Sequence, residues 1–191
     1  MTLLVLMAAY LLGSIPTALL VGKIVGDVDI RTVGDGNMGA HNTKAQFGWG
    51  PGIVVAVVDF AKGALAVTLA KYFSLELSWQ LFALALVVLG HGFPVFAGLR
   101  GGQGLATVLG GLFSLSYLEI LGGLIIYGLI YLITHNSNLG ASIGTGSGVA
   151  LMWLNDKPLI LVLGAVLIIL MIPAKFHLDH SRRMEIRENK I

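Results

Sequence analysis

The sequence contains no cysteine, which excludes thiol catalysis, disulfide bonds and cysteine-bound metals. Charged residues are also scarce: they make up 12% of the chain, against about 25% in ordinary soluble domains. The formal net charge of +2 is too small to indicate nucleic-acid binding. No basic segment precedes the first apolar run, so we expect no cleavable signal peptide. So few polar residues could not cover a water-exposed surface of normal size.

Apolar runs take up most of the sequence. Hydrophobic residues are 56% of the 191 residues, and several runs approach the roughly 20 residues that cross a bilayer as a helix. We therefore predict an all-α, polytopic integral membrane bundle formed by a single domain, residues 1–191. About seven transmembrane helices fit best, although three of them are short and rich in glycine, so six remain the alternative. The predicted spans are approximately residues 3–24, 51–73, 78–96, 105–113, 117–133, 140–154 and 159–173.

The positive residues predict an orientation. In the seven-span arrangement most lysines and arginines outside the apolar runs fall on one side, and only Lys71 and Lys157 mark the other. Short loops rich in lysine and arginine stay in the cytoplasm, so we expect the N-terminus outside and the C-terminus in the cytoplasm. The cytoplasmic face should then carry a polar loop (residues 26–50), a glycine-rich loop (98–104) and a charged tail (174–191).

The polar loop is the first candidate site, because it is longer and more polar than a helix connection requires. Residues 34–39, GDGNMG, match G-x-G-x-x-G, but the dinucleotide fingerprint needs a preceding strand that a membrane span does not supply. Closely spaced glycines also let backbone N–H groups converge on an anion. The alternative is a flexible loop that uses glycine only for positive φ angles. The nearby asparagines and Arg31 favour the anion site.

The glycine-rich loop is the second candidate site. Residues 100–104, RGGQG, lead directly into an apolar run. A helix that begins there would offer free N–H groups and its positive dipole end to a phosphate, and Arg100 could add a bidentate contact. The alternative is a tight turn whose arginine only sets the membrane topology, and the segment alone does not decide between the two.

Two charged residues lie inside an apolar run. Asp59 and Lys62 are three residues apart on one helical face, and each would cost about 2.5–3.5 kcal/mol at the centre of a bilayer. They should therefore pair or face the interior of the bundle. We favour a structural ion pair over a catalytic role.

Three further patterns involve serine or histidine. Residues 140–144, GASIG, match a nucleophile elbow without the strand and partners that the motif needs, so close helix packing is favoured, although Ser142 could still contact a ligand. His177 and His180 are the better general-base candidates because the tail also carries arginines. Two histidines without a third ligand predict no metal site.

Five separate motifs, in order along nearly the whole chain, resemble those of one family: the bacterial membrane glycerol-3-phosphate acyltransferases that use acyl phosphate as acyl donor. The number and order of the motifs make the resemblance specific. They are GSIP at residues 13–16, DIR and G-x-GN-x-GA-x-N at 29–42, D-x-x-KG at 59–63, GH-x-FP-x-F with RGG-x-G-x-AT at 90–107, and His177 with Arg183, which resemble HxxNxxR.

The chain also departs from the family pattern. Three of the changes remove a positive or hydroxyl partner of a phosphate, and one adds a negative charge, which opposes anion binding in a poorly hydrated site. Arg100, Lys44 and a protonated His41 or His180 could restore the balance. The changes are Asp35 for serine, His41 for threonine, Ala45 for arginine, Gln103 for lysine and His180 for asparagine.

The resemblance implies transfer of a fatty acyl group from acyl phosphate to the 1-hydroxyl of glycerol 3-phosphate. The product would be lysophosphatidic acid, made for phospholipid biosynthesis at the cytoplasmic face of the bacterial inner membrane. No cofactor is implied. An enzyme of the same fold with another acceptor, and a non-catalytic protein that binds or transports a small anion, are the alternatives. His177 and Asn37 are the expected catalytic residues, and the expected substrate-binding residues are Arg31, Gly34, Gly36, Gly39, Asn42, His91, Arg100, Gly101, Gly102, Gly104, Ser142 and Arg183.

Overall fold

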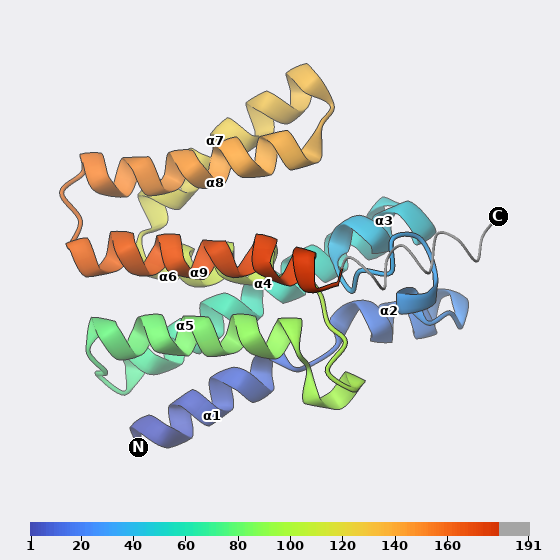
Figure 1. The fold of residues 1–191 in the computed structure, drawn as a ribbon, viewed down its shortest axis with the longest axis horizontal. Helices are drawn as coiled ribbons and strands as arrows, with labels where there is room; N and C mark the ends of the chain where they lie inside the picture. The colour runs from blue at the N-terminus through green and yellow to red at the C-terminus, as the bar shows by residue number, and fades with distance from the viewer. Residues whose placement is uncertain (180–191) are drawn as a thin grey trace.

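The computed structural model describes residues 1–179 and shows an all-α membrane protein. Its long helices run side by side along one direction, and α7 and α8 form a pair at one edge (Figure 1). The helices are α1 (Thr2–Gly13), α2 (Thr17–Gly26), α3 (Ala40–Phe47), α4 (Trp49–Tyr72), α5 (Leu77–Gly92), α6 (Leu105–Leu115), α7 (Tyr117–Thr134), α8 (Ser137–Leu154) and α9 (Leu159–Leu178), with short 3₁₀ turns η1 (Ile30–Thr32) and η2 (Val95–Ala97).

Every apolar segment that the sequence predicts as a span is helical, so the prediction of an all-α membrane bundle is confirmed. Among the described residues, five stretches are long and apolar enough to cross a membrane; they contain α1 with α2, α4, α5, α7 and α9. α6 is apolar but has only 11 residues, and α8, which begins with several polar residues, is not among the five. The count of seven crossings stays a prediction.

Three predicted boundaries need correction. The first span is two helices, because Pro16 lacks an N–H group and restricts the residue before it, which breaks the helix between Gly13 and Thr17. The polar loop is not wholly irregular, since it contains α3. The last helix continues through Pro173 to Leu178, so the first residues assigned to the charged tail are helical.

Glycines bring neighbouring helices into backbone contact. A Cβ atom on Gly63 of α4 would overlap the carbonyl oxygen of Thr107 in α6, and one on Gly110 of α6 would overlap that of Phe60 in α4. Gly144 of α8 packs in the same way against Gly123 of α7, so the predicted packing role of the 140–144 segment is confirmed.

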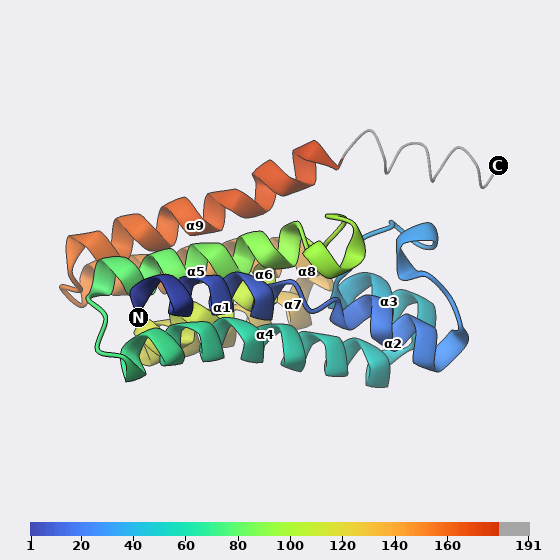
Figure 2. The same cartoon turned by 90° about the horizontal axis from the view of Figure 1, so that it is seen from below.

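The loops with candidate functional residues gather at one end of the bundle. α2, α3 and the C-terminal end of α9 lie at this end, and the N-terminus lies at the other (Figures 1 and 2). Consecutive long helices alternate in direction, so α4, α6 and α8 all begin at the loop end. The fold therefore brings three segments that are far apart in sequence to one place.

Candidate active site

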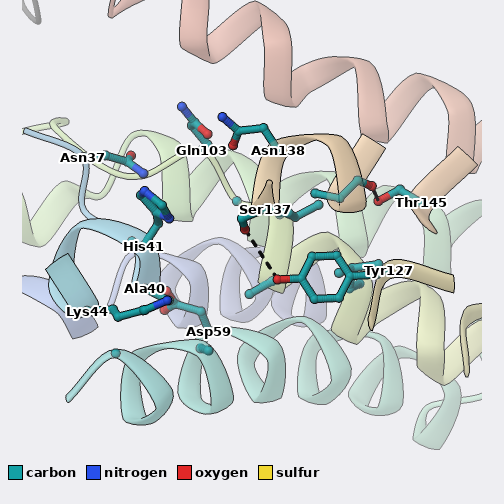
Figure 3. Close-up of a pocket in the computed structure, with 18 of the residues that line it drawn as sticks. Asn37, Ala40, His41, Lys44, Asp59, Gln103, Tyr127, Ser137, Asn138 and Thr145 are labelled. Atoms are coloured by element: carbon teal, nitrogen blue, oxygen red, sulfur yellow. Dashed lines mark hydrogen bonds between the residues drawn. The ribbon is translucent and has the colours of Figure 1, made fainter. Parts of the chain in front are cut away.

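A cavity of about 510 Å³ lies among α3, α4, α6, α7, α8 and the two candidate loops (Figure 3). One part of its lining is apolar and includes Ile53, Leu105, Leu109 and Leu124. The lining also has many polar side chains, which come from the two loops and from α3, α4, α5, α7 and α8. They include Asn37, His41, Lys44, Asp59, His91 and Gln103.

The first turns of four helices border this cavity. The first amides of a helix have no partner within it and form the positive end of its dipole, so a helix N-terminus favours anions. The N-caps of α3, α4 and α6 are Gly39, Gly48 and Gly104, none of which makes a side-chain cap. The N-terminus of α8 is capped, because Asn136 Oδ1 accepts hydrogen bonds from the next two free amides. The lining residues concerned are Ala40 and His41 of α3, Trp49 and Gly52 of α4, Leu105 and Ala106 of α6, and Ser137 and Asn138 of α8.

Asn42 organises the polar loop from inside. Its side chain is buried; Nδ2 donates hydrogen bonds of 3.1 Å to the carbonyl oxygens of Ile30, Val33 and Asn37, and Oδ1 accepts one from the Asp35 N–H. Gly34 and Gly36 have φ angles of +63° and +70°, which residues with side chains rarely adopt. Asn42, Gly34 and Gly36 are not among the described residues that line the cavity, so their predicted substrate contacts stay predictions.

Arg31 connects the two candidate loops. Its guanidinium donates to the Asp29 carboxylate at 2.7 Å and to the carbonyl oxygen of Ala97 in η2 at 2.9 Å. The hydrogen bond from Arg31 lowers the pKa of Asp29, and the same bond raises the pKa of Arg31. Arg31 is likewise absent from the described cavity lining. The geometry shows that it holds the two loops together, and its predicted contact with substrate stays a prediction.

Asn37 and Gly39 of the polar loop line the cavity, as a substrate-contacting role requires. The backbone N–H of Asn37 donates to Asp35 Oδ1 at 3.0 Å, whereas the buried Asn37 Oδ1 accepts no hydrogen bond from the described residues. A buried polar atom without a protein partner costs free energy unless a ligand or water supplies the missing hydrogen bond. Asp35 is not among the described lining residues; its carboxylate supports the turn that presents Asn37.

The glycine-rich loop is pressed against the end of α5. Gly101 and Gly102 donate backbone hydrogen bonds of 3.1 Å to the carbonyl oxygens of Gly92 and His91. A Cβ atom on Gly102 would overlap both His91 Nε2 and the Met38 carbonyl oxygen, so the loop also touches the polar loop. His91 and Gly104 line the cavity, and α6 begins directly after Gly104, as the sequence predicts.

The predicted pairing of Asp59 with Lys62 is confirmed. Lys62 Nζ donates to Asp59 Oδ1 at 2.8 Å and to the carbonyl oxygen of Ile15, at the break between α1 and α2, at 2.5 Å. Thr17 Oγ1 also donates to Asp59, and His91 Nδ1 lies 3.7 Å from the same carboxylate oxygen. The ion pair thus holds the first helices together, and Asp59 also reaches the cavity wall.

Other predicted residues lie away from the cavity lining. Arg100 is exposed, and Ser142 is exposed on α8 while Ala141 and Thr145 of the same helix line the cavity. His177 is exposed at the end of α9. Arg183 and His180 lie outside the described residues. The roles predicted for these residues stay predictions.

Sequence reasoning did not assign a site role to several lining residues. Tyr127 and Tyr131 of α7 face the cavity, and Tyr127 Oη lies 3.4 Å from Ser137 Oγ (Figure 3). Their spacing of four places both rings on one helical face, which is a signal that was available in the sequence. Lys44, which we expect from the sequence to compensate for a lost positive charge, also lines the cavity, where its ammonium stacks on Trp49.

The chain is similar to known proteins along nearly its whole length. Residues 3–185 match the family model described as glycerol-3-phosphate acyltransferase. Glycerol-3-phosphate acyltransferase 1 of Dehalococcoides mccartyi is 36% identical over 191 residues, which cover 97% of this chain and 92% of that protein. Glycerol-3-phosphate acyltransferase 4 of the same species is 44% identical over 144 residues, which cover 74% of this chain and 76% of that protein.

Two solved structures are also similar. Both are described as PlsY, an integral membrane glycerol 3-phosphate acyltransferase, one in the glycerol 3-phosphate form and one in the lysophosphatidic acid form. Their TM-scores are 0.86 and 0.83 at 32% and 31% sequence identity, and each comparison covers 96% of this chain and 92% of the other.

Proposed function

The chain belongs to the glycerol-3-phosphate acyltransferase family, and on this premise we propose that acyl phosphate is its acyl donor and that the cavity is its active site. It is an integral membrane enzyme whose acyl transfer to glycerol 3-phosphate yields lysophosphatidic acid. Family membership favours this enzyme over the alternative of a non-catalytic anion carrier. The donor, the site residues and the orientation in the membrane are the proposed parts.

The convergence of the uncapped α3, α4 and α6 N-termini on one cavity is the observation that carries the proposal. Both proposed substrates bear a phosphate group, and free amides at a helix N-terminus bind phosphate without a cluster of positive side chains. This explains how a cavity with a single lining lysine among the described residues can hold two anionic substrates. The replacement of the family's lysine by Gln103 then matters less, because the N-terminus of α6, which follows Gln103, still borders the cavity.

In the proposed reaction, the 1-hydroxyl oxygen of glycerol 3-phosphate attacks the carbonyl carbon of acyl phosphate. The bond between that carbon and the phosphate oxygen breaks, inorganic phosphate leaves, and the hydroxyl proton passes to a base. The amide of Asn37 is our candidate for stabilising the developing oxyanion, and His177 remains the predicted proton acceptor. Since acyl phosphate is already activated, positioning the two substrates can supply most of the rate.

We assign the acyl chain to the apolar part of the cavity. Ile53, Leu109 and Leu124 come from α4, α6 and α7, and a chain lying between these helices would extend toward the bilayer. The cavity thus offers a polar part for the phosphates and an apolar part for the fatty acid, which is the division that an acyl phosphate requires.

We propose that the loop end of the bundle faces the cytoplasm of a bacterial inner membrane. Lys23, Arg31, Lys44, Arg100 and Lys175 lie at this end, and the opposite connections carry Lys71 and Lys157. This imbalance is the one that the positive-inside rule describes.

The test is an assay of the purified protein in lipid with acyl phosphate and labelled glycerol 3-phosphate. We expect labelled lysophosphatidic acid and inorganic phosphate in equal amounts, and a loss of at least tenfold in kcat for Asn37→Ala. Product from acyl-coenzyme A but not from acyl phosphate would refute the proposed donor. Release of phosphate that requires a different hydroxyl compound would instead favour the altered acceptor.

A further inference from the structure

We propose that Lys44 is a specificity residue that binds the phosphate group of a substrate in the cavity. The inference rests on the proposed function, because it takes the cavity as the acyl-transfer site. Lys44 is the only lysine or arginine among the described residues of the cavity lining. It projects from α3 on the same side as His41 (Figure 3).

The ammonium group of Lys44 has aromatic partners instead of a carboxylate. Its Nζ lies 3.5 Å from the centroid of the Trp49 ring and 6.0 Å from that of Tyr131. Within the described part of the chain, four other lysines are each paired with an acid: Lys23 with Asp27, Lys62 with Asp59, Lys157 with Glu119 and Lys175 with Asp179. Stacking on a ring leaves the N–H donors of an ammonium available to an anion, whereas an ion pair does not.

The backbone and Cβ atom of Lys44 are held in place, while the rest of its side chain can move. A Cβ atom on Gly52 of α4 would meet the Lys44 Cβ at 2.6 Å, so α3 lies close against α4 at this position. The Gly48 N–H donates to the Lys44 carbonyl oxygen at 2.9 Å and ends α3 there. The remaining freedom lies in the side chain, whose flexible stem lets the ammonium turn from Trp49 toward the cavity.

The surroundings favour an anion at this point. Lys44 follows the N-terminal turn of α3, whose positive dipole end borders the same space. Asp59, the acidic lining residue, already accepts hydrogen bonds from Lys62 and Thr17. The charge of Lys44 is therefore available to a substrate phosphate, of either the donor or the acceptor.

The first experiment compares Lys44→Met, which keeps the apolar stem without the charge, with Lys44→Arg. We expect Lys44→Met to raise one KM at least tenfold with a smaller change in kcat, and Lys44→Arg to restore most of the affinity. A higher KM for glycerol 3-phosphate identifies the acceptor phosphate, and a higher KM for acyl phosphate identifies the donor. Unchanged values of both would overturn the proposal. Lys23→Met, which removes an exposed lysine of α2, is the matched control and should change neither.

The second experiment does not depend on turnover. In a Trp79→Phe, Trp153→Phe background, Trp49 is the remaining tryptophan, and its emission should change when glycerol 3-phosphate or inorganic phosphate draws Lys44 from its ring. Lys44→Met should abolish this change. A phosphate-dependent signal without transferase activity would refute the proposed function and retain the Lys44 site. Full activity with no signal and no KM effect would refute the Lys44 site alone.

Discussion

Asn42, Arg31 and Asn37 belong to one short loop, yet their side chains do different work. The Asn42 side chain donates its hydrogen bonds to the loop backbone. The Arg31 side chain donates to the Asp29 carboxylate and the Ala97 carbonyl oxygen. Asn37 keeps a buried oxygen without a described partner and faces the cavity. At the scale of residues, the sequence locates the group but does not separate the side chain that meets a ligand from those that hold it in place.

The Asp29–Arg31 pair gives a prediction about pH. Because Arg31 lowers the pKa of Asp29 in the folded protein, the pair stabilises the fold above the unfolded pKa and loses this contribution as the pH falls through the folded pKa. We expect Asp29→Asn to lower the thermal midpoint by a constant amount between pH 5 and 8. The gap between the two proteins should begin to shrink below about pH 4, near the unfolded pKa, and should close as the pH falls through the lower pKa of the folded carboxylate.

Thermal unfolding of both proteins in the same detergent, across this pH range, measures the gap. Asparagine keeps an oxygen that can accept the Arg31 backbone hydrogen bond but lacks the second acceptor of the guanidinium, so the comparison measures the charge together with its side-chain hydrogen bonds. A gap that grows on acidification would contradict the prediction.

The buried pair of Asp59 and Lys62 gives a second prediction. Removing one member of a buried ion pair leaves an uncompensated charge and costs about 3–5 kcal/mol. We expect Asp59→Asn and Lys62→Met each to lower the stability by this order. The double variant should lose less than the sum, because it leaves no unpaired charge.

Denaturant or thermal unfolding of the three variants provides this double-mutant cycle. Since Lys62 also donates to the Ile15 carbonyl oxygen, the Lys62→Met variant should additionally loosen the break between α1 and α2. Strict additivity would mean that the pair contributes no coupling energy, and the interpretation would then be wrong.

At the scale of elements, apolar runs were sufficient to predict the helices of the bundle, because burial in lipid is a local property of composition. α3 could not be found in this way. Its sequence, AHNTKAQF, has no apolar face of its own, and the helix is held by close packing on Gly52 of α4. The lining of the cavity likewise divides into residues that the local sequence predicts and residues that it does not. Gly104 and His91 lie in recognisable motifs, whereas Thr145 reaches the cavity only because α8 packs there.

Glycine contacts between elements give a third prediction. In Gly110→Ala, the added methyl group would overlap the Phe60 carbonyl oxygen and push α6 away from α4. Overpacking of this kind typically costs about 1–3 kcal/mol. Activity should fall as well, because the first turn of α6 borders the cavity.

Gly146→Ala in α8 is the matched control. A Cβ atom there meets nothing within 4 Å, so the thermal midpoint should stay the same or rise slightly through the better helix propensity of alanine, by up to about 1 kcal/mol. Equal losses for the two variants would argue against a close α4–α6 contact.

At the scale of the whole molecule, the alternation of the helices explains why a chain with few charges can hold anions. α4, α6 and α8 run in the same direction because one reversed helix separates each from the next, so they begin at the same end. Their N-terminal residues Trp49, Leu105 and Ser137 all line the cavity. In the proposed site, the positive ends of these parallel dipoles would replace the lysines and arginines that a soluble phosphate site would use.

The orientation of this end is the last prediction, and the absence of cysteine makes it easy to test. Ala45→Cys introduces one exposed thiol at the loop end, and Glu76→Cys introduces one at the opposite end. If the loop end is cytoplasmic, a membrane-impermeant maleimide added to intact bacteria whose outer membrane has been permeabilised should label Glu76→Cys at once. It should label Ala45→Cys only after the inner membrane is opened. The chain without cysteine is the blank, since any signal from it must come from other proteins. The reverse labelling pattern would overturn the cytoplasmic site, and with it the positive-inside argument for this chain.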